Sequence, residues 1–224
     1  MMSRLEGAIR KLQKLYGPLP SPPSDPFAFF VWEILSGHST PRKRDAAFRA
    51  LTRQRVLTPD AMWTASPKML EASVALAGPF CHHRLLALRK GVDVFRRSPA
   101  LPSVIVGPIA VARRHLKPLP RMGGESSAYR MLLFAGNHAV LPVDARVARV
   151  GTRLGYGDAV GNFSKTARAV RQAVDADLPR SLDGYRRAYL YLEHHGAETC
   201  TETDPHCDEC PLRGNCAYGQ DRRR

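Results

Sequence analysis

Residues 195–216 read HGAETCTETDPHCDECPLRGNC and contain four of the five cysteines of the chain. Cys200, Cys207, Cys210 and Cys216 follow the spacing C-x6-C-x2-C-x5-C. Four soft sulfur donors this close in sequence are typical of a site for an iron–sulfur cluster or a zinc ion. Zinc sites commonly use two short C-x2–4-C pairs, whereas only Cys207 and Cys210 form such a pair here. We therefore expect a four-iron cluster, with zinc as the less favoured alternative.

The composition of the chain argues against reading the four cysteines as two disulfides. The 224 residues suffice for one domain or two small ones, and they contain no apolar run long enough to span a membrane. The start, MMSRLEGAIRKLQKLYG, lacks the apolar core of a signal peptide. These features predict a cytoplasmic, nucleoid-associated protein, in which thiols stay reduced. The net charge of +14 favours nucleic acid or an anionic membrane surface as the partner.

The rest of the chain is rich in helix-start signals and almost lacks the two-residue alternation of strands. Proline at the first helical position follows an N-cap residue at Asp25-Pro26, Thr40-Pro41, Thr58-Pro59 and Ser66-Pro67. Ser164 is a further candidate cap. The pattern predicts an all-α fold, with helices over about 1–16, 27–37, 41–53, 59–65, 67–76, 80–97, 108–117, 165–177 and 183–195.

Two further segments combine helix signals with residues suited to chemistry. Residues 116–136, LKPLPRMGGESSAYRMLLFAG, stop at prolines, turn through Gly123-Gly124 and restart, which predicts a helix-hairpin-helix. Such glycines let the backbone approach a phosphate, although a Gly-Gly turn is also common for structural reasons. Residues 141–155, LPVDARVARVGTRLG, place Asp144 at the start of another helix. For Asp144 an N-cap role is the alternative to a catalytic one.

The order of these motifs resembles that of the endonuclease III family of DNA glycosylases. The cysteine spacing matches the family's cluster loop, and residues 25–40, DPFAFFVWEILSGHST, are similar to its first barrel helix. The resemblance implies two helical lobes: a six-helix barrel with the helix-hairpin-helix at about 23–135, and a cluster domain formed by 1–22 plus 136–224. It also implies that the four cysteines hold a [4Fe-4S] cluster in a structural role.

The same resemblance gives Asp144 a catalytic role. Family members rotate a nucleotide out of duplex DNA and break its N-glycosidic bond, which builds oxocarbenium character on the sugar. A carboxylate can stabilise that cation and orient an attacking water. Bifunctional members also carry a lysine, eighteen residues before the aspartate, that forms a Schiff base. Ser126 stands at that position here, so we expect a monomeric, monofunctional glycosylase of base-excision repair.

Candidate DNA contacts follow from the resemblance as well. His38 stands where the first barrel helix of the family carries a glutamine that probes the base stack. His82 and His83 lie in the turn that corresponds to the family's wedge loop, with a solvated polar turn as the alternative. The hairpin contributes Arg121, Gly123 and Gly124, and Arg146 replaces a family histidine.

Two function classes compete with a glycosylase. A DNA-binding protein with little or no catalysis would recognise distorted or branched DNA through charge and shape, and it would release no base from any lesion duplex. An iron–sulfur electron carrier fits poorly with the charge of +14 and the hairpin. The glycosylase and the DNA-binding protein without catalysis both predict strongly salt-dependent DNA binding.

Overall fold

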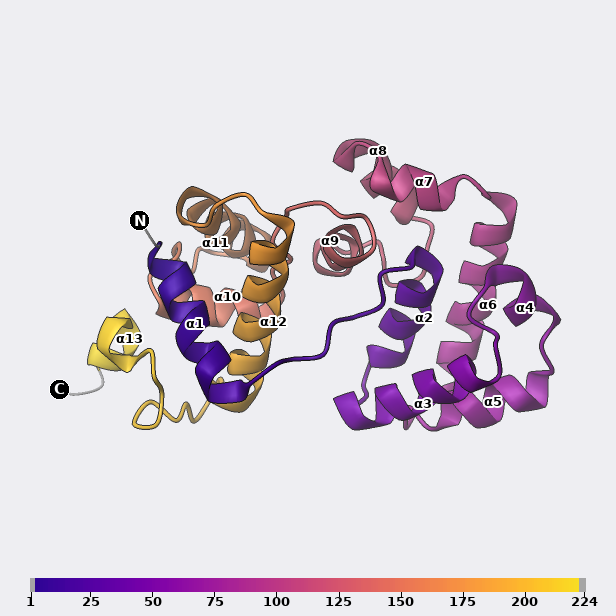
Figure 1. Ribbon diagram of the computed structural model, residues 1–224, viewed down its shortest axis with the longest axis horizontal. Coiled ribbons are helices and arrows are strands. Elements are labelled where there is room, and N and C mark those ends of the chain that lie inside the picture. Colours follow the sequence, from indigo (N-terminus) through magenta and orange to yellow (C-terminus); the bar gives the residue numbers. More distant parts are fainter. Residues whose placement is uncertain (1–2, 222–224) are drawn as a thin grey trace. The chain divides into compact units, whose positions relative to one another are not determined.

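The protein is helical throughout the part that the computed structural model describes, residues 3–221 (Figure 1). This confirms the predicted all-α class. The helices are α1 (Arg4–Tyr16), α2 (Pro26–Ser36), α3 (Pro41–Arg53), α4 (Pro59–Thr64), α5 (Pro67–Ala75), α6 (Cys81–Arg97), α7 (Leu101–Val106), α8 (Ile109–Leu116), α9 (Glu125–Phe134), α10 (Ala145–Arg153), α11 (Phe163–Asp177), α12 (Leu182–Glu198), the 3-10 turn η1 (Arg213–Asn215) and α13 (Ala217–Asp221). None of the described helices is both long enough and apolar enough to cross a bilayer.

The predicted N-caps account for most helix starts in the first half of the chain. The side chains of Asp25, Thr40 and Thr58 each accept a hydrogen bond from a backbone N–H in the first turn of α2, α3 and α4. Ser66 occupies the N-cap of α5 without a side-chain bond. All four starts are confirmed, and at Asp25, Thr40 and Thr58 the capping oxygen satisfies an N–H that has no partner within the helix.

Three details of the helix prediction were wrong. The cap of α11 is Asn162, not Ser164, and its side chain accepts from the N–H of Lys165. Helix α7 was not predicted, although its early proline, Pro102, is tolerated in a first helical turn. Helix α13 follows the last cysteine and was not predicted either, because five residues are too few to show a helical period.

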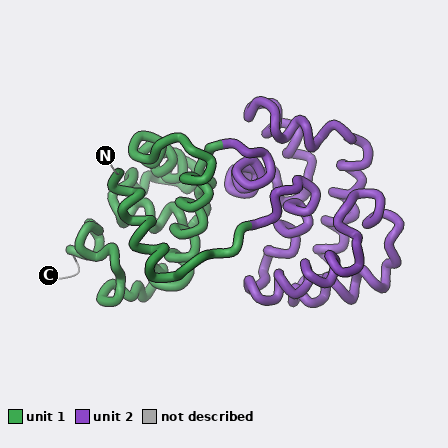
Figure 2. Tube along the Cα trace, viewed as in Figure 1, with its two compact units in different colours: residues 1–21, 139–224 green, residues 22–138 purple. Residues whose placement is uncertain are grey.

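The chain divides into two compact units, residues 1–21 with 139–224, and residues 22–138 (Figure 2). Unit 1 contains α1 and α10 to α13, so both ends of the chain contribute to it. Helix α1 packs on α12 and α11 through Leu5, Ile9 and Leu12, all buried. The assignment of these units to a cluster domain and a barrel stays a prediction.

Helix α2 lies at the core of unit 2. Its sequence, PFAFFVWEILS, is buried along nearly its whole length, and it packs against α3, α6, α7 and α9. Gly91 of α6 permits the closest of these approaches. A β-carbon built there would lie 2.0 Å from Cζ of Phe30, so only glycine leaves room for the aromatic ring. The one acidic residue of α2, Glu33, is fully buried as well.

Candidate functional site

Asp144 is the N-cap of α10 in unit 1. Its Oδ1 accepts hydrogen bonds from the N–H groups of Arg146 and Val147, both at 3.0 Å. Its Oδ2 accepts from the hydroxyl of Tyr189 on α12, at 3.2 Å. The side chain is half-buried rather than enclosed. The N-cap interpretation is therefore confirmed, and it leaves the carboxylate fixed in place with a single side-chain donor on Oδ2.

Arg146, a predicted DNA contact, is engaged within unit 1. Its guanidinium forms an ion pair with Glu193 of α12, and about half of its side chain, 52%, is exposed. Gly196 of α12 allows this helix to lie close to α10, since a β-carbon at Gly196 would come within 2.8 Å of Cβ of Arg146. The charge of Arg146 is partly neutralised by this pair, so any contact with a phosphate must compete with Glu193.

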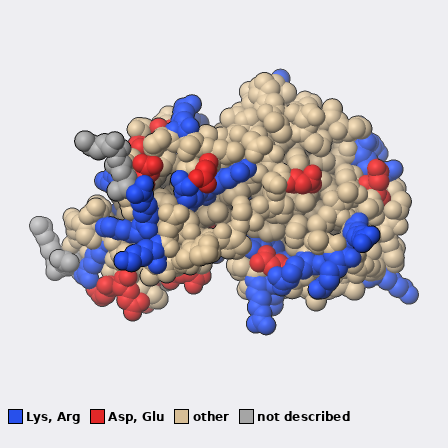
Figure 3. Space-filling view, in the orientation of Figure 1, with Lys and Arg blue, Asp and Glu red and all other residues tan. Residues whose placement is uncertain are grey.

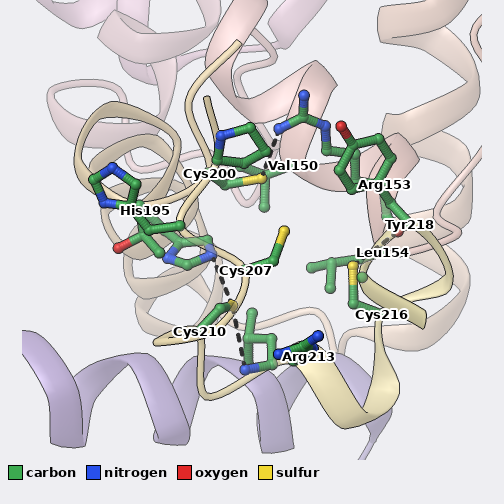
Figure 4. A pocket seen from close by; sticks show the side chains of 15 residues that line it. Val150, Arg153, Leu154, His195, Cys200, Cys207, Cys210, Arg213, Cys216 and Tyr218 are labelled. Atoms are coloured by element: carbon green, nitrogen blue, oxygen red, sulfur yellow. Dashed lines mark hydrogen bonds between the residues drawn. The ribbon is translucent and has the colours of Figure 1, made fainter. Parts of the chain in front are cut away.

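The four predicted ligands Cys200, Cys207, Cys210 and Cys216 line one pocket of unit 1, and all of them are free thiols. Figure 4 shows the sulfur atoms of Cys200, Cys207 and Cys216 directed into this pocket. The disulfide alternative is not what the structure contains. The walls between the sulfurs are apolar and include Val150, Leu154 and Leu212.

The pocket gives these thiols hydrogen-bond donors and a mutual repulsion. Sγ of Cys200 accepts from a guanidinium N–H of Arg153 at 3.3 Å, and Sγ of Cys210 accepts from the N–H of Leu212 at 3.4 Å. Burial, together with the charge of neighbouring cysteines, raises the pKa of the Cys210 and Cys216 thiols. If all four cysteines in this buried pocket were thiolates, they would require a positively charged group between them.

Four cysteine thiolates are a donor set that could hold either an iron–sulfur cluster or a zinc ion. Within residues 3–221, no three His, Cys, Asp or Glu side chains are grouped closely enough to hold a single metal ion. Tetrahedral zinc needs four donors at about 2.0–2.3 Å from one point. A [4Fe-4S] cluster takes one thiolate on each of its four irons, so its ligands surround a wider space.

Helix α10 joins the cysteine loop to Asp144. Arg149 donates to the carbonyl oxygens of Cys200 and Gly196 at 2.9 and 2.6 Å. Arg153, one turn further on, donates to the carbonyl oxygen of Thr201 at 2.6 Å. The same short helix therefore carries the candidate catalytic carboxylate at its N-terminus and anchors the loop with its later arginines.

Helix α1 contacts two residues, His195 and Thr199, that line the cysteine pocket. Its last residue, Tyr16, has its hydroxyl 2.8 Å from Nδ1 of His195 and 2.6 Å from Oγ1 of Thr199. His195 lines the pocket, with Nε2 3.6 Å from Sγ of Cys210. Burial, with a smaller contribution from the charge of His194, lowers the pKa of His195 to about 4. His195 is thus a neutral hydrogen-bonding residue at physiological pH.

Unit 2 contains the predicted hairpin, between α8 and α9. Gly123 and Gly124 are exposed, and a β-carbon at either would meet no atom within 4 Å. Neither has a positive φ, whereas Arg121 does, at 67°. The side chain of Arg121 turns towards the end of α2, where it packs on Gly37 and lies 3.9 Å from Glu33. The hairpin is therefore open to solvent at its glycines and tied to α2 at its arginine.

Ser126 lies in the first turn of α9, and its hydroxyl is buried. Its Oγ has no hydrogen-bond partner among the described residues, in contrast to Ser127, which donates to Oε1 of Glu33 at 2.9 Å. A buried hydroxyl without a partner costs free energy, so a water molecule or a ligand group is expected beside it.

Glu33 was missed by the sequence analysis. It is fully buried, its Oε1 accepts from Ser127 and Arg130 of α9, and its Oε2 has no partner within the described chain. An ionised carboxylate in a protein core is rare unless it is paired. The available signal was a single acidic residue within the apolar run PFAFFVWEILS, where helical periodicity alone predicts a buried position.

The predicted histidines of unit 2 belong to a chain of aromatic rings. The ring centroids of His38 and Phe80 are 5.2 Å apart, those of Phe80 and His83 6.0 Å, and those of His82 and His83 6.2 Å. Phe80 was also missed, although it is 54% exposed and has a left-handed φ of 68°. Both features are unfavourable for a bulky aromatic residue, which suggests a role for the exposed ring.

Arg84 holds the two turns of this aromatic cluster together. It is buried and donates to the carbonyl oxygens of Gly37 and Ala77 at 2.7 and 3.2 Å, and also to those of His38, Gly78 and Pro79. Burial lowers its pKa. Because both terminal nitrogens of the guanidinium donate to carbonyl oxygens of the two turns, Arg84 ties the turn of His38 to that of Phe80, while its Nε has no partner among the described residues.

Comparison with known proteins identifies the architecture. No protein-family model matches the sequence, and neither does any curated protein sequence. Among solved structures, endonuclease III trapped in a covalent complex with DNA matches with a TM-score of 0.72 and 19% identity, covering 99% of this chain and 98% of that one. A thermostable thymine-DNA glycosylase matches with a TM-score of 0.72 and 17% identity, covering 97% of each chain.

A third solved structure extends the likeness. The 3-methyladenine DNA glycosylase of H. pylori, bound to 1,N6-ethenoadenine, matches with a TM-score of 0.65 and 11% identity, covering 90% of this chain and 100% of that one. All three comparisons cover most of both chains. The likeness is one of architecture: the chain has the helix-hairpin-helix fold of the HhH-GPD DNA glycosylases.

Proposed function

We propose that the protein is a DNA N-glycosylase of base-excision repair that acts as a monomer on duplex DNA. The observation that carries this proposal is the geometry of Asp144 on a glycosylase fold. Its Oδ1 is locked by two backbone N–H groups, and its Oδ2 is held only by the hydroxyl of Tyr189. A half-buried carboxylate with a fixed orientation is suited to stabilising a sugar cation.

The chemistry begins with extrusion of a nucleotide, at a cost of a few kcal/mol. As the N-glycosidic bond breaks, positive charge develops at C1′ of the sugar, and the Asp144 carboxylate stabilises it and orients a water molecule. Tyr189 is a positioning residue, since its hydroxyl fixes the rotation of the carboxylate. The base leaves with the electron pair of the N-glycosidic bond and takes up a proton from solvent, while the water oxygen bonds to C1′ and loses one proton to solvent or the carboxylate.

Ser126 makes the proposed enzyme monofunctional. An uncharged hydroxyl cannot form a Schiff base with C1′, so strand cleavage by the lyase route is not expected. The buried Oγ without a partner is consistent with a water molecule beside it. Water is the expected nucleophile in place of an amine.

The aromatic cluster and the hairpin supply the proposed DNA contacts of unit 2. Exposed rings such as those of Phe80 and His38 can stack on bases once a nucleotide has left the helix. The open backbone at Gly123 and Gly124 can approach a phosphate. Arg121, His82 and His83 are proposed as secondary contacts of unit 2, and Arg146 as a secondary contact of unit 1.

The four cysteines would hold a [4Fe-4S] cluster. The cluster would supply the positive charge that the buried thiolates lack, and it would cross-link the loop 200–216 internally, while Arg149 ties that loop to α10. Iron and acid-labile sulfide analysis of the purified protein tests this directly. Four irons per chain are expected, and one zinc per chain would contradict the proposal.

A lesion panel tests the proposed activity. Wild-type protein is incubated with duplexes that each carry one damaged or mismatched base, and release of the free base is measured. We expect release from at least one duplex, loss of that release in Asp144→Asn, and no covalent adduct with an abasic duplex under borohydride. Absence of release from every duplex, with binding intact, would favour the DNA-binding protein without catalysis.

A further inference from the structure

Helix α3 carries the most strongly cationic exposed surface of unit 2. Arg42, Arg49 and Arg53, which we call the α3 stripe, are all exposed. None of them forms an ion pair with a described residue, whereas Arg44 is paired with Asp45 and lies over the ring of Trp32. Figure 3 shows Lys and Arg gathered over α3, in the lower right of the view. The stripe is therefore available to an outside partner.

The helical period places the three arginines on one face. At about 3.6 residues per turn, positions i, i+7 and i+11 lie within roughly 40° of one another around the axis. This face is opposite the one that buries Ala47, Ala50 and Leu51. At ~1.5 Å per residue the stripe extends over about 16 Å, the length of roughly five base pairs at ~3.4 Å each.

The cations in the first turn of α3 are unfavourable for the stability of that helix. Arg42 and Lys43 lie in the first turn of α3, which contains no acidic residue. Cations at the N-terminus of a helix oppose its dipole at a cost of about 0.3–1 kcal/mol each. No acidic residue outside the helix offsets this within the described chain. An anionic ligand at this end would offset it.

The stripe begins beside the aromatic cluster. Lys43 lies next to the turn before Phe80, since a β-carbon on Gly78 would be 3.5 Å from Cδ of Lys43. Arg84 ties that turn to Gly37 and His38, directly before α3. The cations therefore lead away from the rings along α3, and all of these residues belong to unit 2.

We infer that the α3 stripe binds the phosphate backbone of the DNA flank on one side of the extruded nucleotide. This inference rests on the proposed DNA-binding function. A membrane-docking helix needs apolar side chains beside its cations, and none of the exposed large apolar residues of the described chain lies on α3. A protein interface would likewise need an apolar centre. A row of cations on a helix with no exposed large apolar residue is suited to binding a polyanion.

Salt-dependent binding tests the stripe. The triple variant Arg42→Gln, Arg49→Gln, Arg53→Gln is compared with wild type on a duplex that carries a central, uncleavable abasic analogue. Each phosphate contact contributes about 0.9 to the slope of log K against log salt, so the slope should fall by about 3. Affinity should fall at least roughly tenfold at about 50 mM salt. Unchanged slope and affinity would overturn the inference.

Two matched variants separate local contact from net charge and from folding. Arg10→Gln, Lys11→Gln, Lys14→Gln removes three exposed cations of α1 and should change the slope less; an equal change would overturn the inference. The Arg→Lys triple at the stripe keeps the charge and should bind nearly as wild type. If the glutamine triple proves unstable, failure of the Arg→Lys triple to bind while folded would overturn the inference as well.

Shortened duplexes and vesicles complete the test. Removing the flank on the contacted side of the lesion should abolish the difference between wild type and the glutamine triple, whereas removing the other flank should not. A difference that persists for both truncations would contradict a one-sided contact. Stripe-dependent binding to phosphatidylserine vesicles with unchanged DNA binding would identify a membrane instead. Base release without a slope change would leave the glycosylase proposal standing and the stripe inference refuted. A slope change without base release would leave the stripe inference standing and would contradict the glycosylase proposal.

Discussion

At the scale of single residues, Asp144 combines two roles that are usually separate. The carboxylate that would act on the sugar is also the cap that begins α10. Asparagine caps a helix as well as aspartate does, whereas alanine does not. This difference allows the structural and chemical contributions of one side chain to be measured apart.

We predict that Asp144→Asn abolishes base release but leaves the free energy of unfolding within about 0.5 kcal/mol of wild type. Asp144→Ala should also abolish release and cost about 1 kcal/mol, because two N–H groups lose their acceptor. Urea unfolding and base release are measured on the same preparations. Residual activity in Asp144→Asn near the wild-type level would remove the residue from the catalytic machinery.

Glu33 is the buried charge on which the start of α9 depends. Replacing it with glutamine leaves Arg130, whose side chain is only 17% exposed, without its carboxylate. We predict a loss of about 3–5 kcal/mol in the free energy of unfolding. Ser127→Ala, which removes one hydrogen bond to the same oxygen, should cost only about 1 kcal/mol. An equal effect of the two substitutions in urea unfolding would contradict this ranking.

At the scale of the elements, α10 is the link between chemistry and the cysteine loop. Arg149 reaches two carbonyl oxygens at and beyond the end of α12, and Arg146 on the same helix forms a surface ion pair. Charged donors to buried backbone oxygens contribute more than exposed ion pairs. The loop should therefore respond to Arg149 and hardly to Arg146.

We predict that Arg149→Met lowers the free energy of unfolding by about 1–3 kcal/mol and speeds proteolysis within residues 199–216. Methionine keeps the apolar stem and removes the guanidinium, so the loss comes from two carbonyls without donors. Arg146→Met is the control and should cost about 0–1 kcal/mol. Equal proteolysis rates in both variants would show that the loop does not depend on α10.

Helix α1 is joined to α11 by a hydrogen-bonded group with a predictable pH response. Oδ2 of Asp177 accepts from the N–H of Leu5 at 2.8 Å and from the hydroxyl of Tyr156 at 2.5 Å. Burial alone would raise the pKa of Asp177, but these bonds and the charge of Arg4 hold it below its ordinary value. Burial raises the pKa of Tyr156 to about 12, and its bond to Asp177 adds to this.

These shifts predict losses of stability at both ends of the pH range. Asp177 has a lowered pKa, so its contribution is present above the ordinary carboxyl pKa of about 3.9 and is lost as pH falls through the folded value. Tyr156 has a raised pKa, so its contribution is present below about 10 and is lost as pH rises towards about 12. Tyr156→Phe should reduce the alkaline part of this loss without abolishing it, because burial also raises the pKa of Tyr16 and of Tyr185. Urea unfolding across pH measures it, and an unchanged alkaline loss would contradict the assignment.

At the scale of the whole molecule, unit 2 is one continuous segment, whereas unit 1 needs both ends of the chain. We predict that residues 22–138 expressed alone unfold cooperatively and keep their helical circular dichroism. Residues 139–224 alone should lack a cooperative transition, because Leu5, Ile9 and Leu12 no longer cover α12. A cooperative transition in the second fragment would show that α1 is dispensable for the core of unit 1.

Local signals in the sequence predicted the fold well, and tertiary contacts limited the prediction of the site. The starts of α2, α3 and α4 are predictable because each has a capping side chain, at Asp25, Thr40 or Thr58, followed by proline. This signal is local, since the capping hydrogen bond forms within four residues. Asp144 and the four cysteines stand out by motif. Glu33 and Phe80 do not, because their importance arises from α9 and from His38, which pack against them only in the folded chain.

The division of unit 1 between the chain ends also governs how the protein is made. During translation α1 leaves the ribosome first, but its partner α12 begins only at Leu182. At about 5–20 residues per second, the apolar face of α1 waits roughly 8–33 seconds for that partner. Unit 2 can meanwhile complete its own core. The nascent chain thus exposes Leu5, Ile9 and Leu12 to chaperones until α12 has been made.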